Sequence, residues 1–292
     1  MKIIIHSYST TGTRPQNEDA MDIINNLDES DPKLIKILYA GVFDGHGGGN
    51  ISKTLIDRDK INIGKYFTNK TSPIANNLSA SKSFNKKMII PLFSRIQEKL
   101  KNFHVHSNKM GSTALISLIY NRSEKSDKCN LKIINLGDTR ATICNEYNIG
   151  VQLSLDHKPH LFCERSRINS LGGTITESDG DDPRIGGMSV SRSFGDLDNK
   201  YICNLPDVFD YMLDREKFLI LACDGVWDVL SNQDAVDFVL NKINQLTTEK
   251  KVLSNFKAKS DQNIANKLAD YAIAKGSTDN ISLYIIFFTD QM

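Results

Sequence analysis

Short runs of apolar residues, separated by polar segments, recur along the chain. A run of four to eight apolar residues bounded by turn-forming residues is typical of a buried β-strand. We therefore predict strands at Lys2–Ser7, Leu34–Phe43, Ala114–Tyr120, Leu131–Leu136, Ala141–Cys144, Phe218–Cys223 and Ile281–Phe288. The last of these runs is apolar almost throughout, which predicts a strand that is buried on both faces.

Apolar residues at helical spacing follow some of these strands. From Met88 onward they recur every three or four positions, which predicts a long helix. Ser231 and Asp234 resemble a capping box at the start of a second helix. Gly276 is placed to end a third helix that begins near Ile264. Because strands and helices do not alternate strictly, this order predicts an α+β fold with mainly antiparallel sheets.

The overall charge of the chain is nearly balanced. Its 292 residues include 36 Lys and Arg against 35 Asp and Glu, a formal net charge of +1. This balance argues against broad binding of nucleic acid or of an anionic membrane surface. No apolar run approaches the roughly 18 residues of a membrane-spanning helix. Since the N-terminus also lacks the pattern of a signal peptide or a myristoylation site, we expect no membrane anchor.

The five cysteines are scattered and contain no CxxC pair. An odd number without paired spacing predicts free thiols, and not a zinc site or a disulfide framework. Free thiols are typical of proteins in reducing compartments. We therefore expect the chain in the cytoplasm, the nucleus or both.

Aspartates stand at the ends of several predicted buried strands. Asp44, Asp138 and Asp224 each follow such a strand, and Asp279 lies just before the last one. These carboxylates would repel one another if the strand ends met, and a hard divalent cation such as Mg²⁺ or Mn²⁺ would compensate them. Asp–Gly pairs are also common in tight turns, and for any one pair alone a turn is the better interpretation. Their repetition at strand ends favours a metal site.

Two residues near these carboxylates add to the picture. His46 lies among four glycines in GHGGG, which permit a close approach of the backbone to a ligand and favour a functional histidine over a surface one. Arg14 precedes an acidic pair in RPQNEDA, and its guanidinium matches the geometry of phosphate. An isolated arginine in a loop would more often be a surface residue. Arg192, in SVSRSFGD, has the same ambiguity and less support.

Nine segments of the chain resemble, in order, the motif series of the metal-dependent protein serine/threonine phosphatases of the PP2C type. The segments are RPQNEDA, GVFDGHGGG, GSTALISLI, NLGDTRA, LSLDHKP, ERSRINSLGGTI, MSVSRSFGD, LILACDGVWDVL and STDNISLYII. The resemblance runs from about Arg14 to Phe287. It implies one catalytic domain over residues 1–292, with two antiparallel sheets flanked by helices in a four-layer α-β-β-α sandwich.

The resemblance also implies a site for two Mn²⁺ or Mg²⁺ ions per chain. By matching motif, Asp44 would bridge both ions, and the backbone carbonyl of Gly45 would bind one of them. Asp224 and Asp279 would hold the other. The residues expected to orient metal-bound water are Glu18, Asp19 and Asn280. The residues that would bind a weaker third cation, as in some members, are Asp138 and Asp228 together with Asp224.

The implied reaction is hydrolysis of phosphoserine and phosphothreonine in proteins. A metal-bound hydroxide would attack phosphorus, Arg14 would hold the phosphoryl oxygens, and His46 would protonate the leaving oxygen. We expect phosphorylated proteins as substrates and a monomeric enzyme. Two alternatives stay open, a pseudophosphatase that only binds and a metallohydrolase of small phosphate esters or nucleotides. The full set of acidic residues speaks against the first, and the lack of a GxxxxGK[ST] segment speaks against nucleotide binding.

Overall fold

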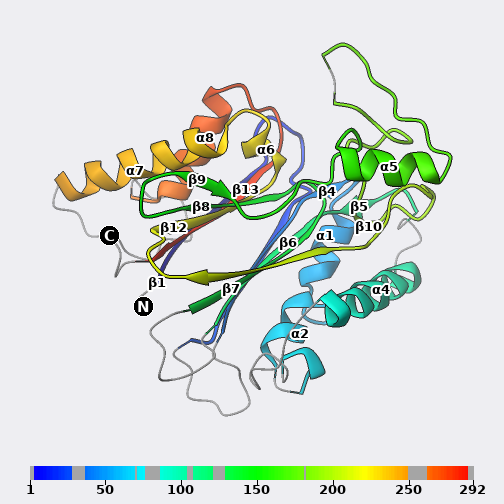
Figure 1. Cartoon of the computed structure of the whole chain (residues 1–292), viewed down its shortest axis with the longest axis horizontal. Helices are drawn as coiled ribbons and strands as arrows, with labels where there is room; N and C mark the ends of the chain where they lie inside the picture. The colour runs from blue at the N-terminus through cyan, green and yellow to red at the C-terminus, as the bar shows by residue number, and fades with distance from the viewer. Residues whose placement is uncertain are drawn as a thin grey trace.

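Two stacked β-sheets form the centre of the molecule (Figure 1). The computed structural model describes residues 3–27, 37–69, 71–75, 86–103, 108–120, 129–180, 182–248 and 262–288. Within these ranges two five-stranded antiparallel sheets pack against each other, and helices cover both outer faces. This arrangement confirms the predicted α+β fold with four layers.

The first sheet contains the last strand of the chain in an interior position. Its strands, in spatial order, are β1 (Ile3–Thr10), β13 (Ile281–Phe288), β12 (Phe218–Ala222), β8 (Arg140–Cys144) and β9 (Gly150–Gln152). Every residue of β13 is buried, as the sequence predicted. The reason is that β13 pairs with β1 on one side and β12 on the other, while both of its faces are covered.

The second sheet has two edge strands that the sequence did not reveal. Its strands, in spatial order, are β11 (Asp207–Leu213), β7 (Cys129–Leu136), β6 (Ala114–Tyr120), β3 (Ile37–Phe43) and β2 (Ala20–Asn25). Most residues of β11 and β2 are only partly buried, so neither strand has a continuous apolar run. A third, small sheet contains β10 (Phe194–Gly195), β5 (Gly111–Ser112) and β4 (Gly45–His46).

Alternating side chains of the strands build three hydrophobic layers. Along β3, Leu38, Ala40 and Val42 face the other sheet, while Tyr39 and Phe43 face the helices. The helices on that side are α1 (Asn50–Ile56), α2 (Ile63–Thr68) and α4 (Lys86–Phe103). Those against the first sheet are α6 (Asp224–Trp227), α7 (Asn232–Thr248) and α8 (Ile264–Ala274).

The predicted helix signals are present in the structure. The apolar spacing after Met88 falls within α4. At the start of α7, the backbone N–H of Ser231 donates to Asp234, and the N–H of Asp234 donates to Ser231 Oγ, each at 3.1 Å. Gly276 follows α8 with a φ of 103°, a left-handed conformation that favours glycine. Lys2 and residues 34–36, part of two predicted strands, lie outside the described residues.

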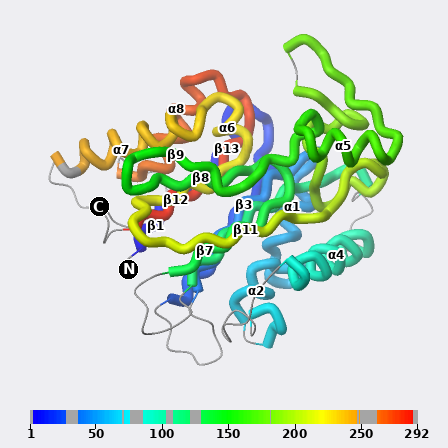
Figure 2. The backbone as a smooth tube through the Cα atoms, in the orientation of Figure 1, coloured from blue at the N-terminus to red at the C-terminus, as the bar shows by residue number. Residues whose placement is uncertain are grey.

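A long excursion of the chain lies beside α5 (Phe162–Ser170). Residues 171–180 and 182–190, light green in Figure 2, project from the sandwich next to this helix. A β-bridge between Thr176 and Arg184 joins the two ranges, and a second bridge, between Ile185 and Met188, lies within the later range. We call this segment the flap. Among the described helices, none combines the length and the apolar character needed to cross a membrane.

Candidate metal centre

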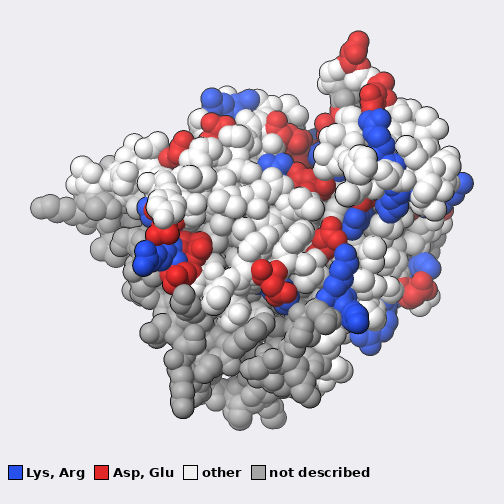
Figure 3. All heavy atoms as spheres, in the orientation of Figure 1, with Lys and Arg blue, Asp and Glu red and all other residues white. Residues whose placement is uncertain are grey.

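One cavity of about 1030 Å³ gathers most of the residues singled out from the sequence. It lies where strand ends meet the flap. Of the predicted site residues, those that line it are Arg14, Glu18, Asp44, Gly45, His46, Asp138, Asp224, Asp228, Asp279 and Asn280. Asp19 does not line the cavity and is buried behind it. In Figure 3 acidic side chains gather in the hollow between α6 and α5.

Asp44 occupies a rigid position directly after β3. Its backbone N–H donates to Thr113 Oγ1 at 3.0 Å, and the N–H of Thr113 donates to the Asp44 carbonyl at 2.8 Å. This reciprocal pair joins the end of β3 to the start of β6. Burial raises the pKa of Asp44 well above its usual range, and the charges of Asp224, Asp19 and Asp138 raise it further. Asp44 is thus a partly buried carboxyl at the cavity wall, close to other carboxyls.

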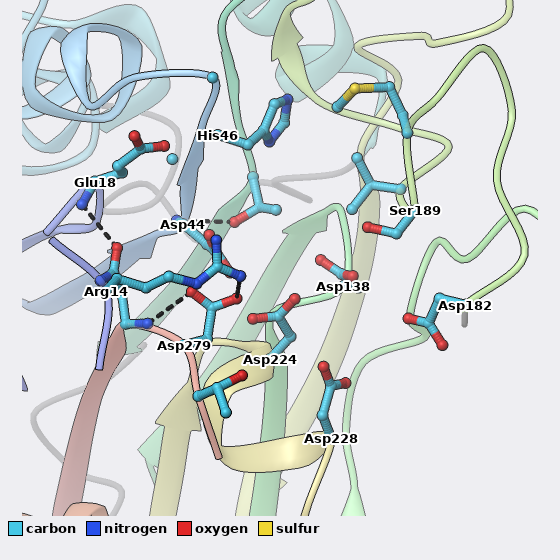
Figure 4. Close-up of a pocket in the computed structure, with 18 of the residues that line it drawn as sticks. Arg14, Glu18, Asp44, His46, Asp138, Asp182, Ser189, Asp224, Asp228 and Asp279 are labelled. Carbon is cyan, nitrogen blue, oxygen red and sulfur yellow. Dashed lines mark hydrogen bonds and ion pairs between the residues drawn. The ribbon is translucent and has the colours of Figure 1, made fainter. Parts of the chain in front are cut away.

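Three carboxylates meet at the base of the cavity. Oxygen atoms of Asp44, Asp138 and Asp224 all lie within 4.8 Å of one another (Figure 4). They come from the ends of β3, β7 and β12, which are far apart in the chain. Burial raises the pKa of Asp224, and the charges of Asp138 and Asp228 add to this effect. Their mutual repulsion is the cost that a divalent cation removes.

A second close group lies behind the first and shares Asp44 with it. Ligand atoms of Asp19, Asp44 and Cys223 also lie within 4.8 Å of one another. Burial raises the pKa of Asp19 to about 6. Among the described residues, neither carboxylate oxygen of Asp19 has a hydrogen-bond partner. Unpaired buried oxygens around Asp44 fit hard oxygen-seeking cations such as Mg²⁺ or Mn²⁺.

Asp279 lines the same cavity but is not part of either close group. Its Oδ2 accepts a hydrogen bond from Arg14 Nη2 at 2.8 Å, and its Oδ1 accepts one from the Asn280 N–H at 2.7 Å. Figure 4 shows the Arg14 guanidinium beside the Asp279 carboxylate, next to Asp224. The charge of Asp279 also raises the pKa of Asp224. Asp279 therefore influences the group of Asp44, Asp138 and Asp224 through its charge, although it is not part of that group.

Asn280 fastens the loop that contains Arg14 to the start of β13. Its Oδ1 accepts from the Glu18 N–H at 2.8 Å, and its Nδ2 donates to the carbonyls of Thr11 and Gln16 at 3.0 and 2.9 Å. The Glu18 carboxylate in turn accepts from the Gly48 N–H at 3.0 Å. These bonds set the position of the loop, a role that the sequence alone did not suggest for Asn280.

Gly45 allows two backbone segments to approach closely. A side chain at this position would overlap the carbonyl oxygen of Glu18. The glycine therefore lets the Glu18 loop pack directly against the segment that follows Asp44. This contact places the backbone of Gly45 at the cavity wall.

His46 has a partner that the sequence analysis missed. Its Nε2 lies 2.7 Å from Oδ2 of Asp196, a residue that is only 4% exposed. Asp196 ends the segment SVSRSFGD, which also contains Arg192. Arg192 does not line the cavity and instead binds the buried carboxylate of Glu164. The arginine in this segment is thus structural, and the aspartate is the residue that contacts the site.

Lys158 also went unnoticed in the sequence. Its Nζ lies 2.9 Å from Oδ2 of Asp138, 2.9 Å from Oδ2 of Asp182 in the flap and 3.8 Å from Oδ1 of Asp228. The segment LSLDHKP contains this residue, so the only available signal was its place in a motif. Lys158 brings a positive charge to the residues expected to bind a third cation.

Comparisons with known proteins identify the family of this chain. A sequence model of protein phosphatase 2C matches residues 5–281. A PP2C-like domain-containing protein of Acanthamoeba polyphaga mimivirus is 44% identical over 178 residues, 57% of this chain and 99% of that protein. A probable protein phosphatase 2C of Oryza sativa subsp. japonica is 32% identical over 97% of this chain and 75% of its own length.

The fold has close structural neighbours as well. A solved serine-threonine phosphatase 2C from Toxoplasma gondii superposes with a TM-score of 0.70, at 22% identity, covering 97% of this chain and 94% of that one. At this identity the likeness concerns the fold. Family membership is shown by the match of the family model over nearly the whole chain. The chain belongs to the protein phosphatase 2C family of metal-dependent hydrolases that act on phosphoproteins.

Proposed function

We propose that this chain hydrolyses phosphoserine and phosphothreonine in proteins with the help of two Mn²⁺ or Mg²⁺ ions held in the cavity. The observation that carries this proposal is the group formed by the buried carboxylate of Asp138 and the partly buried carboxylates of Asp44 and Asp224, whose oxygens lie within 4.8 Å of one another beside an exposed arginine. Such a group is costly without compensating cations. A phosphate-binding guanidinium beside it is suited to phosphate esters.

Each residue has a defined part in the proposal. The residues that would hold the two ions are Asp44, the carbonyl of Gly45, Asp224 and Asp279. Glu18 and Asp19 would orient water near the ions. Asp138 and Asp228, with Asp224, would hold a weaker third ion, for which they would have to release Lys158. When bound, such ions supply Lewis acidity that activates water and offsets the charge of the phosphoryl group.

The side chains of the protein handle the substrate. Arg14 exposes its guanidinium to the cavity and would bind the phosphoryl oxygens by a forked contact. His46 lines the cavity and would give a proton to the serine or threonine oxygen as that oxygen leaves. An alkoxide is a poor leaving group, so this proton matters more for a phosphopeptide than for an aryl phosphate. The chain's single catalytic domain would contain all of these groups.

A metal titration tests the proposal. The protein is first treated exhaustively with EDTA, and hydrolysis of a phosphothreonine peptide is then followed as Mn²⁺ or Mg²⁺ is added. We expect no turnover in EDTA and a saturable recovery with either ion. Asp224→Asn should nearly abolish the recovery, while Asp237→Asn, the same change at an exposed site on α7, should leave it intact.

Other outcomes would point elsewhere. Activity that survives full chelation would contradict a metal-dependent site. Binding of the phosphopeptide without turnover at any Mn²⁺ concentration would favour a pseudophosphatase. Turnover of small phosphate esters alone would favour the third interpretation of the sequence.

A further inference from the structure

His46 is held by a buried carboxylate on the side of the ring away from its backbone attachment. Its Nε2 lies 2.7 Å from Oδ2 of Asp196, and Ser193 Oγ donates to that same oxygen. His46 is 24% exposed, whereas Asp196 is 4% exposed and does not line the cavity. Among the described residues, Nδ1 of His46 has no hydrogen-bond partner. The ring is thus anchored through one nitrogen only.

The backbone around this contact is built to bring the two residues together. In the small sheet, His46 of β4 pairs with Gly111 of β5, and Gly111 pairs with Gly195 of β10. A side chain at Gly111 would overlap both the Asp196 carboxylate and His46 Nε2. The glycine at this position is therefore required for the His46–Asp196 contact.

Asp196 itself adopts an uncommon backbone conformation. Its φ is +50°, in the left-handed region that residues other than glycine seldom occupy. The strain is maintained by its neighbours, because the Asp196 N–H donates to the Met110 carbonyl at 3.0 Å and Gln97 binds both the N–H and the carbonyl of Gly195 at 2.9 Å. Strained residues held in this way often serve a functional site.

The geometry points to Asp196 as a positioning residue that holds His46 by Nε2 and leaves Nδ1 as the nitrogen that delivers the proton. This inference rests on the proposed phosphatase function. Because Oδ2 already accepts a hydrogen bond from Ser193, the carboxylate acts as an acceptor and the ring nitrogen Nε2 as the donor. Because the orientation of the ring and the nitrogen that bears the proton are both fixed before the reaction, ordering the ring adds nothing to the activation free energy.

The proton transfer balances as follows. A bond forms between the oxygen of water and phosphorus, and the bond between phosphorus and the seryl or threonyl oxygen breaks. The leaving oxygen keeps that electron pair and takes the proton from Nδ1. Nε2 keeps its own proton and continues to donate it in a hydrogen bond to the Asp196 carboxylate. The attacking water releases one proton to solvent, and a solvent proton later restores the ring.

Leaving-group dependence tests the role of Asp196. The conservative change is Asp196→Asn, since asparagine tolerates the left-handed conformation and keeps the shape while it removes the charge. At saturating Mn²⁺ we expect at least about a 10-fold loss of kcat on a phosphothreonine peptide, within the about 10²- to 10⁴-fold range of general acid catalysis. On p-nitrophenyl phosphate, whose leaving group needs no proton, the loss should stay within about 3-fold.

Three further variants sharpen the result. Gly111→Ala, which separates the pair without changing either member, should reproduce the same selective loss. Asp198→Asn, the same change two residues away at an exposed position, should affect neither substrate. In a His46→Gln background, Asp196→Asn should cost nothing more, because the two residues act as a unit. Equal losses on both substrates, or additive losses in the double variant, would overturn the inference.

A measurement without substrate separates this inference from the proposed function. In ¹⁵N-resolved NMR spectra of the imidazole, with His46 assigned by its loss in His46→Gln, the neutral ring of the wild type should carry its proton on Nε2. Gly111→Ala should give a mixture of the two tautomers. A wild-type ring protonated on Nδ1 would overturn the inference even in an active enzyme. Wild-type protein inactive on both substrates would refute the proposed function and leave this NMR result to decide the contact.

Discussion

Arg14 and Asp279 form an ion pair at the cavity, with 2.8 Å between Nη2 and Oδ2. Both side chains are partly exposed, at 55% and 37%. Ion pairs in contact with water contribute only about 0 to 1 kcal/mol, so an incoming phosphate can replace Asp279 as the partner of Arg14 at little cost. The pair therefore keeps the guanidinium in place near the carboxylate group without locking it.

Arg14→Ala should weaken both catalysis and phosphate binding. Loss of one preorganised donor to a phosphoryl oxygen predicts a fall in kcat/KM of about 10²-fold, with Arg14→Lys intermediate because it keeps the charge but loses the fork. Competitive inhibition by inorganic phosphate should weaken in the same order. Arg215→Ala, which removes an exposed arginine paired with Glu146, is the matched control. An unchanged inhibition constant for phosphate in Arg14→Ala would contradict the assignment.

Asp224→Asn should make the metal-free protein more stable and the metal-loaded protein less so. Removing one of three crowded carboxylates relieves repulsion, and relief of about 1 kcal/mol would raise the unfolding temperature by about 2 °C. The upward shift caused by Mn²⁺ should shrink, because the variant binds the ion more weakly. Thermal unfolding with EDTA and with Mn²⁺ measures both effects. If Mn²⁺ stabilises the variant as much as the wild type, Asp224 is not a ligand.

Lys158→Met should destabilise the metal-free protein. The Lys158 ammonium pairs with Asp138, which is only 1% exposed, and removing one partner of a buried pair costs about 3 to 5 kcal/mol. Mn²⁺ should restore part of this loss by replacing the missing positive charge. Lys158→Arg, which keeps the charge, should behave more like the wild type. Equal unfolding temperatures for Lys158→Met and wild type in EDTA would show that the pair contributes nothing.

Glu164 should make the protein sensitive to acid. Burial alone would raise the pKa of Glu164, but hydrogen bonds from Arg192, Ser191 and Arg167 outweigh it and lower the pKa from 4.5 to about 2. A carboxyl with a lowered pKa in the folded state contributes stability above its unfolded pKa, and this contribution is lost as pH falls toward the folded pKa. The stabilisation is therefore complete above about pH 5 and disappears toward about pH 2.

Glu164→Gln should remove this acid-sensitive part. A shift of this size corresponds to about 3 kcal/mol at neutral pH. Urea unfolding at a series of pH values should show a lower free energy of unfolding at pH 7 and a flatter decline in acid. Glu177→Gln, at an exposed glutamate paired with Arg165, serves as the control. Parallel acid curves for Glu164→Gln and wild type would contradict the expectation.

Local patterns determined much of the fold. The run at Ile281–Phe288 is apolar because both faces of β13 are covered, and such a run is readable without the partner strands. The Ser231–Asp234 box and Gly276 were readable for a similar reason, since a helix end is satisfied by residues three or four positions away. The edge strands β2 and β11 were not predicted, because polar residues on their more exposed sides interrupt the apolar run.

For the site, the sequence by itself determined which residues stand at strand ends, among them Asp44, Asp138 and Asp224. It did so because burial of a strand dictates its apolar composition, and the first carboxylate after it marks where it ends. Only the tertiary structure decided that Asp196, 150 positions from His46, holds its ring, and that Lys158 reaches Asp138. Such contacts depend on how the two sheets stack and on which backbone segments approach each other closely. Neither of these can be deduced from a local pattern of residues.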